Sequence, residues 1–87
     1  MTRAPKVTVQ FLRRAQSCFV RVLWTTRFVE TIKLSPVGYE RAKRRARYLL
    51  GDTVTTGTFR GQLATVLELV ATIDTFGDEF RRLEVMK

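Results

Sequence analysis

One stretch of the sequence, residues 35–51 (SPVGYERAKRRARYLLG), constrains the fold more than any other, because it signals both ends of a helix. The Ser35 hydroxyl suits a helix N-cap, and Pro36 suits the first helical position, where the missing N–H needs no partner. Gly51 tolerates the left-handed turn that ends many helices. The apolar residues that recur at the spacing of one helix face are Ala42, Ala46, Leu49 and Leu50. The stretch therefore predicts an amphipathic helix over residues 36–50.

The rest of this helix surface is basic, with Glu40 as its one acid. One stripe, at the spacing i, i+3, i+4, i+7, consists of Arg41, Arg44, Arg45 and Tyr48, and the neighbouring row consists of Lys43 and Arg47. Guanidinium groups form paired hydrogen bonds with phosphates, and a tyrosine ring can stack on a base. A run of one sign predicts salt-dependent binding to a polyanion. The alternative is a solvated helix face that keeps the domain soluble.

Charge is divided unevenly along the chain, which has 87 residues and a net charge of +8. Residues 1–50 hold twelve Lys and Arg against two acids, whereas residues 51–87 hold four against six. The length predicts a single domain over residues 1–87, with residues 1–5 as a disordered lead. The basic excess indicates an anionic partner. Four arginines of the first half are expected to support the basic helix: Arg13, Arg14, Arg21 and Arg27.

Composition also narrows the function classes. The chain has no histidine, the commonest general base and metal ligand, and its lone cysteine, Cys18, lies among apolar residues as a buried hydrophobe would. We therefore expect no catalysis, no metal and no cofactor. No apolar run approaches the ~20 residues that span a bilayer, and arginines interrupt every candidate secretory core. The expected location is the cytoplasm of the host cell, without a membrane partner.

The first half outside the helix alternates as strands do. Residues 6–12 place Val7, Val9 and Phe11 on one face, and residues 13–17 read as a connection. Residues 19–24 and 27–34 are predicted to form a hairpin linked by Thr25 and Thr26, with Trp24 and Phe28 packed in the core and Arg21 and Arg27 on one solvent face. An amphipathic helix over residues 9–24 is the alternative.

The second half is harder to interpret. Residues 52–61 are rich in threonine and glycine and predict a loop with a short strand. Residues 62–76 (QLATVLELVATIDTF) fit either a helix or a strand, and their β-branched residues favour a strand. Residues 80–86 would then return beside it. One of Phe59, Phe76 and Phe80, which flank glycines or turns, is a candidate exposed contact residue.

These elements predict an α+β fold, a small antiparallel sheet with one basic helix, residues 36–50, packed on a face. The alternative is a mostly helical bundle with helices near residues 9–24, 36–50 and 60–76.

The order strand, tight link, strand, helix over residues 19–50, with ERAKRRA at residues 40–46, resembles small sheet-plus-helix proteins of phages and mobile elements, some of which are anti-CRISPR inhibitors. The resemblance implies an inhibitor that occupies a surface of a nucleic-acid-handling complex, such as a protein target of a host defence system. Two other hypotheses remain open: a regulator or architectural protein that binds DNA or RNA directly, and a structural subunit that assembles through residues 62–76. The sequence leaves the oligomeric state open.

Overall fold

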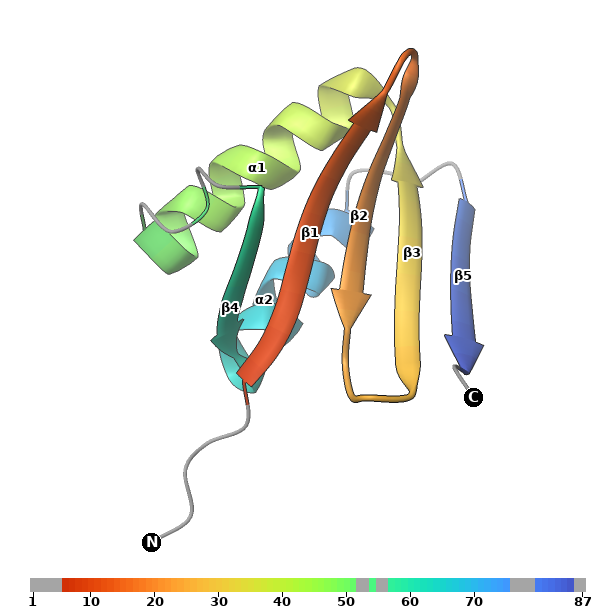
Figure 1. Ribbon diagram of the computed structural model, residues 1–87. Coiled ribbons are helices and arrows are strands. Elements are labelled where there is room, and N and C mark those ends of the chain that lie inside the picture. Colours follow the sequence, from red (N-terminus) through yellow and green to blue (C-terminus); the bar gives the residue numbers. More distant parts are fainter. Residues whose placement is uncertain (1–5, 52–53, 55–56, 76–79, 86–87) are drawn as a thin grey trace, which may run out of the picture.

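The computed structural model describes residues 6–51, 54, 57–75 and 80–85, with side chains from residue 83 onward in the last segment. It confirms the α+β class and excludes the helical bundle, because the chain forms a five-stranded antiparallel sheet. Two helices, rather than the expected one, lie on one face of this sheet (Figure 1). The elements are β1 (Lys6–Arg14), β2 (Ser17–Leu23), β3 (Phe28–Leu34), α1 (Pro36–Leu50), β4 (Thr58–Gln62), α2 (Leu63–Asp74) and β5 (Phe80–Val85).

The strands lie in the order β4-β1-β2-β3-β5, so the first three form a central meander and the last two form the edges. The alternating pattern of residues 6–34 is confirmed as strands, and the alternative helix over residues 9–24 is wrong. β1 runs further than expected, to Arg14, and a tight turn follows in which Ala15 has a φ of 51°. Arg13 and Arg14 therefore belong to a strand rather than to a connection.

Helix α1 forms where its end signals predict. The Ser35 Oγ accepts a hydrogen bond from the Gly38 N–H at 3.1 Å, and Pro36 takes the first helical position. Gly51 has a φ of 77° and donates its N–H to the Arg47 carbonyl. The buried residues of the helix are small apart from one tyrosine: Gly38, Tyr39, Ala42 and Ala46. Because small residues face the sheet, α1 can lie close to it and carry its long side chains outside.

The prediction of a strand over residues 62–76 is wrong, because Leu63–Asp74 forms helix α2. Its inner face consists of Val66, Leu69, Val70 and Ile73, all buried against the sheet. Burial of four large side chains at helical spacing outweighs the small strand preference of β-branched residues. The returning strand β5 consequently pairs with β3 and not with residues 62–76.

The core lies between the sheet and the helices. Phe11 of β1 packs edge-on against Tyr39 of α1, with ring centroids 5.7 Å apart, and stacks with Phe59 of β4 at 5.8 Å. Phe59 is thus buried and not an exposed contact residue, whereas the other two phenylalanines named with it lie outside the described side chains. A Cβ at Gly61 would lie 2.7 Å from the Leu50 Cδ2, so a larger residue there would require the Leu50 side chain to shift.

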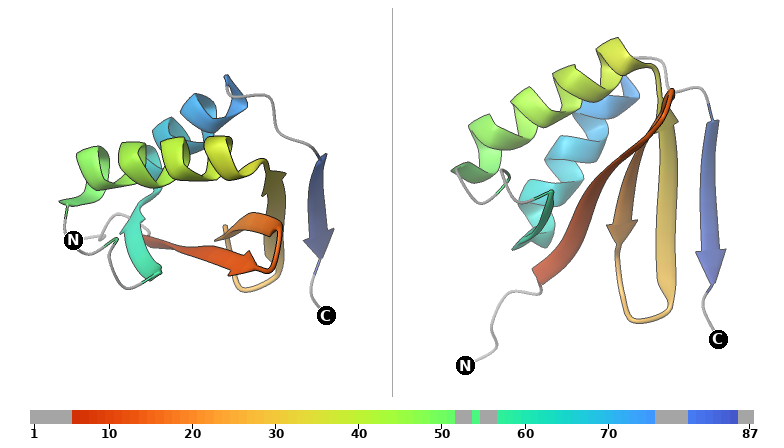
Figure 2. Two further views of the ribbon diagram at one scale, coloured as in Figure 1. Left: turned by 90° about the horizontal axis from the view of Figure 1, so that it is seen from above. Right: turned by 45° about the horizontal axis from the view of Figure 1, so that its top comes forward.

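The opposite face of the sheet carries no helix or strand within the part of the chain that the structure describes (Figure 2). We call it the open face. The register assigns its side chains, because directly paired residues of neighbouring antiparallel strands share a face. Those used below are Gln10, Leu12, Arg14, Phe19, Arg21 and Lys33.

Candidate nucleic-acid interface

The outer surface of α1 gathers six of the predicted site residues on one element. We call it the α1 ridge, made of Arg41, Lys43, Arg44, Arg45, Arg47 and Tyr48. Lys43 and Arg45 are half-buried, and the other four are exposed, Tyr48 by 78%. Arg41, Arg44 and Arg47 form no ion pair with another described residue. Their guanidinium groups therefore project into solvent, where an anion can reach them.

Two hollows flank the ridge. The first, of about 320 Å³, lies between the helices and is lined by Arg41, Arg44, Arg45, Tyr48 and Thr72. The second, of about 200 Å³, is lined by Glu40, Lys43, Arg44 and Arg47. The stripe and the row expected from the spacing thus line separate hollows, and Arg44 borders both. Arg44 therefore lies between the two hollows and can contact a ligand in either of them.

Arg45 differs from its neighbours because it joins the two helices. Its Nη2 lies 3.4 Å from the Glu68 Oε1 of α2, and its guanidinium carbon lies 4.9 Å from the centre of the Tyr48 ring. Its Nε is buried and has no hydrogen-bond partner among the described residues. Arg45 thus covers part of the Tyr48 ring and fixes α1 against α2, so its charge is less available to a ligand than that of Arg41 or Arg44.

At the beginning of α1, the ridge meets β1. The Arg13 Nη1 lies 3.6 Å from the Glu40 Oε1, with both side chains 55% exposed. Beneath them, the Lys43 ammonium lies 5.5 Å from the centre of the Tyr39 ring. Burial raises the pKa of the Tyr39 phenol above its ordinary value, with further increases from Cys18 and Glu40. Arg13 therefore lies beside the α1 ridge, paired with the one acid of α1.

The other three supporting arginines lie elsewhere. Arg14 and Arg21 point to the open face, and the Arg21 Nη1 donates a hydrogen bond to the Gln10 Oε1 at 3.5 Å. Arg27 lies in the exposed turn between β2 and β3, so it does not share a strand face with Arg21 as expected. The predicted set is therefore divided among the ridge, the open face and this turn.

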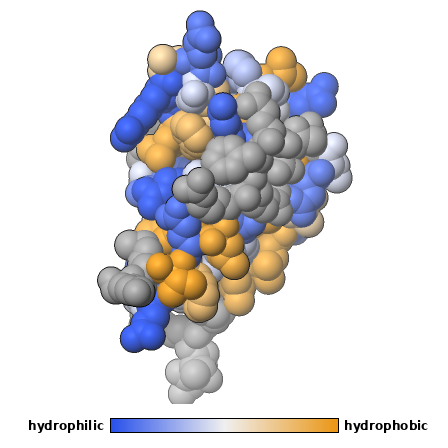
Figure 3. All heavy atoms as spheres, turned by 90° about the vertical axis from the view of Figure 1, so that its right-hand side faces the viewer, coloured by the Kyte–Doolittle hydropathy of each residue, from blue (hydrophilic) through white to orange (hydrophobic). Residues whose placement is uncertain are grey.

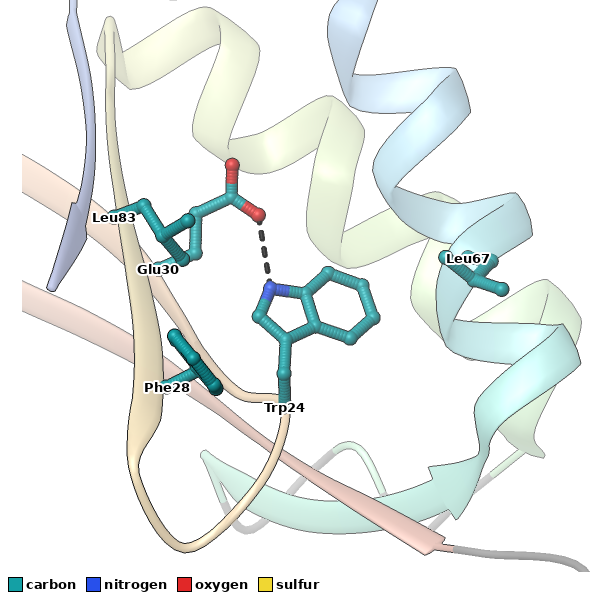
Figure 4. Close-up of a pocket in the computed structure, with 5 residues that line it drawn as sticks. All are labelled: Trp24, Phe28, Glu30, Leu67 and Leu83. Atoms are coloured by element: carbon teal, nitrogen blue, oxygen red, sulfur yellow. Dashed lines mark hydrogen bonds between the residues drawn. The ribbon is translucent and has the colours of Figure 1, made fainter. Parts of the chain in front are cut away.

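An apolar hollow that the sequence reading missed lies on the helix side of the sheet, between α2 and β5 (Figure 4). It measures about 330 Å³ and is lined by Trp24, Phe28, Glu30, Leu67 and Leu83. The Trp24 Nε1–H donates a hydrogen bond to the Glu30 Oε1 at 2.9 Å. This bond explains why the Glu30 carboxylate lies on the apolar side of β3, between Phe28 and Ile32. An acid at this apolar position is the signal in the sequence that could have indicated the hollow.

The helices leave this part of the sheet uncovered, so hydrophobic side chains reach the surface on the β5 side (Figure 3). Phe28 is 42% exposed, Leu67 52%, and Leu83 and Val85 62% each. The prediction that Phe28 packs in the core is therefore wrong. Trp24, in contrast, is half-buried and packs against the core. The exposed group forms an apolar patch around the hollow.

Cys18 has a free thiol, and its side chain is buried within the core. Among the described residues, no three His, Cys, Asp or Glu side chains gather into a potential metal site. None of the helices in the described part of the chain has the length and apolar character needed to cross a membrane. Comparison of the chain with protein-family models, curated proteins and solved structures gave no match.

Proposed function

We propose that this protein binds nucleic acid through the α1 ridge, chiefly by contacts with phosphates. The observation that carries the proposal is the concentration of five cations within seven residues of one exposed helix surface, with Glu40 as the sole acid on α1. A helix with this surface is convex and fits against the backbone or the groove of a duplex. Phosphate contacts supply most of the affinity of such interfaces.

The ridge cations differ in how much each is expected to contribute to phosphate binding. Arg41, Arg44 and Arg47 are exposed and form no ion pair with another described residue, so phosphate contacts require no internal bond to break. Arg45 is engaged with Glu68. α1 contains no Asn or Gln, the side chains that read adenine in a bidentate manner. Its exposed arginines can hydrogen-bond to guanine as well as to phosphates, so we expect any base preference to be for guanine rather than adenine.

The test is the salt dependence of duplex binding, measured by fluorescence anisotropy on a labelled duplex. Four phosphate contacts, from Arg41, Lys43, Arg44 and Arg47, predict a slope of about −3.6 for log K against log salt concentration. Substitution of Arg41→Gln together with Arg44→Gln removes two contacts and makes the slope less steep, about −1.8.

Substitution of Lys6→Gln together with Arg60→Gln is the matched control, because it removes two exposed cations from other elements. It leaves the slope close to that of the wild type if the ridge is the interface. No binding to any duplex at low salt, or equal losses in the two double variants, would contradict the proposal.

The apolar hollow favours a second candidate function, docking on a nucleoprotein complex as an inhibitor of the anti-CRISPR type. Exposed apolar patches of this kind are common at protein–protein interfaces. Affinity capture of partners with this protein, carried out after nuclease treatment, separates the two functions. A protein bound at the hollow stays captured after the nuclease, whereas a partner held through nucleic acid is lost. Leu67→Asp should then abolish capture, whereas Arg41→Gln with Arg44→Gln should preserve it. A partner retained by Leu67→Asp would exclude the hollow as the docking site.

A further inference from the structure

We propose that the open face of the sheet is a second site, which binds unpaired nucleotides of single-stranded nucleic acid around Phe19. Its residues are separate from the α1 ridge and lie on the other side of the sheet. The proposal goes beyond duplex binding by the ridge and does not depend on it.

Phe19 lies on the open face near the turn between β1 and β2. It lies on β2, the central strand, and pairs directly with Leu12 of β1 on one side and with Lys33 of β3 on the other. It is half-buried, so neighbouring strands support the ring while part of it stays accessible. Leu12, Arg14, Phe19 and Arg21 line a hollow of about 220 Å³. The ring is therefore placed as a platform on which a base can stack.

Cations surround this platform. Arg14 lies next to Leu12 along the face of β1, and Arg21 next to Phe19 along β2, each about 7 Å away as side chains two residues apart on a strand are. Lys33 lies on the neighbouring strand. A ring flanked by cations on two sides matches a nucleotide, which presents an aromatic base and a phosphate within one unit.

The same geometry argues against other occupants. A duplex hides the faces of its bases in the stack, so Phe19 contributes nothing to its binding, whereas unpaired bases are free to stack. An apolar protein surface would have to bury the charged groups of Arg14 and Arg21, which lie among the apolar side chains, without an opposite charge. A single strand satisfies both the ring and the charges.

The experiment compares two labelled probes in fluorescence anisotropy: a twelve-nucleotide oligothymidine, and an abasic chain of the same length, which keeps the phosphates and lacks the bases. We expect the wild-type protein to bind oligothymidine at least about tenfold more tightly than the abasic chain, because stacking on one ring has this magnitude. Phe19→Leu should reduce oligothymidine affinity about tenfold and leave the abasic chain unchanged within twofold.

Two further variants sharpen the test. Arg14→Gln with Arg21→Gln should weaken both probes alike, because it removes charge and keeps the ring. Phe19→Tyr should retain the preference for oligothymidine, and circular dichroism checks that each variant is folded.

Several outcomes would overturn the proposal. Equal affinity of the wild type for the two probes means that no base is stacked. Equal loss on both probes in Phe19→Leu means that the ring acts only through the fold. A dimer in light scattering that Phe19→Leu dissociates, without oligothymidine binding, identifies a second copy as the occupant. Unchanged duplex binding in the ridge variant would contradict only the ridge proposal, so the two proposals fail separately.

Discussion

Helices α1 and α2 lie side by side on the same face of the sheet and differ in almost every other respect (Figure 2). α1 is capped at both ends and presents small residues to the sheet and cations to solvent. α2 has no side-chain cap, presents four large apolar residues to the core, and carries no cation. Its acid Glu68 instead pairs with Arg45 of α1.

The difference shows how a small domain divides its tasks between two elements. α2 buries four apolar side chains in the core, and its outward positions carry no cation. α1 buries mainly small side chains and can devote its outer surface to cations. Among the described residues, α2 contributes Glu68 and Thr72 to the surroundings of the ridge.

The largest expected effect tests the role of α2 in the core. Leu69 is fully buried, so Leu69→Ala should lower the free energy of unfolding by about 2–5 kcal/mol through lost burial and a cavity. Leu67, 52% exposed, is the matched control, and Leu67→Ala should cost less than about 1 kcal/mol. Urea denaturation measures both. Similar costs at these two positions would place them on one face, as in a strand, and contradict the helix.

A smaller effect is expected from the caps. Ser35→Ala removes the acceptor of the Gly38 N–H and should cost about 1 kcal/mol of stability. Gln62, at the corresponding position of α2, makes no capping hydrogen bond, so Gln62→Ala should leave the stability nearly unchanged. Thermal denaturation of both variants makes the comparison. If the losses are equal, the side-chain cap does not distinguish the helices.

The smallest effect concerns the contact between the helices. Arg45 and Glu68 are partly exposed, so their coupling in a double-mutant cycle should be about 0.2–1 kcal/mol and should fall with added salt. The single variants Arg45→Ala and Glu68→Ala and their combination supply the cycle. Zero coupling at low salt would show that Arg45 is available to a ligand after all, and would add it to the phosphate contacts of the ridge.

The sequence predicts α1 well because its signals are local: a cap, a proline, a terminal glycine and one apolar stripe all lie within residues 35–51. The central strands follow from alternation for the same reason. α2 is missed because β-branched residues such as Val66, Val70 and Ile73 prefer strands locally, and only packing on the sheet decides for the helix.

The surfaces are less predictable than the elements. The side of the sheet to which Arg14 points depends on how far β1 extends, which a pattern of polar residues does not define. The hollow at Trp24 requires β5 to pair with β3, across roughly half of the chain. Such long-range pairing leaves no local signal, so the ridge could be predicted and the open face and the hollow could not.

The order of the strands also bears on how the domain forms during synthesis. β1, β2 and β3 are neighbours both in the sheet and along the chain, and α1 follows them directly. Contacts between segments close in sequence form quickly, whereas β4 and β5 must close long loops to reach β1 and β3. We therefore expect the meander with α1 to leave the ribosome as an early folding unit. Both basic surfaces belong to that unit, and the edge strands β4 and β5 then pair with β1 and β3.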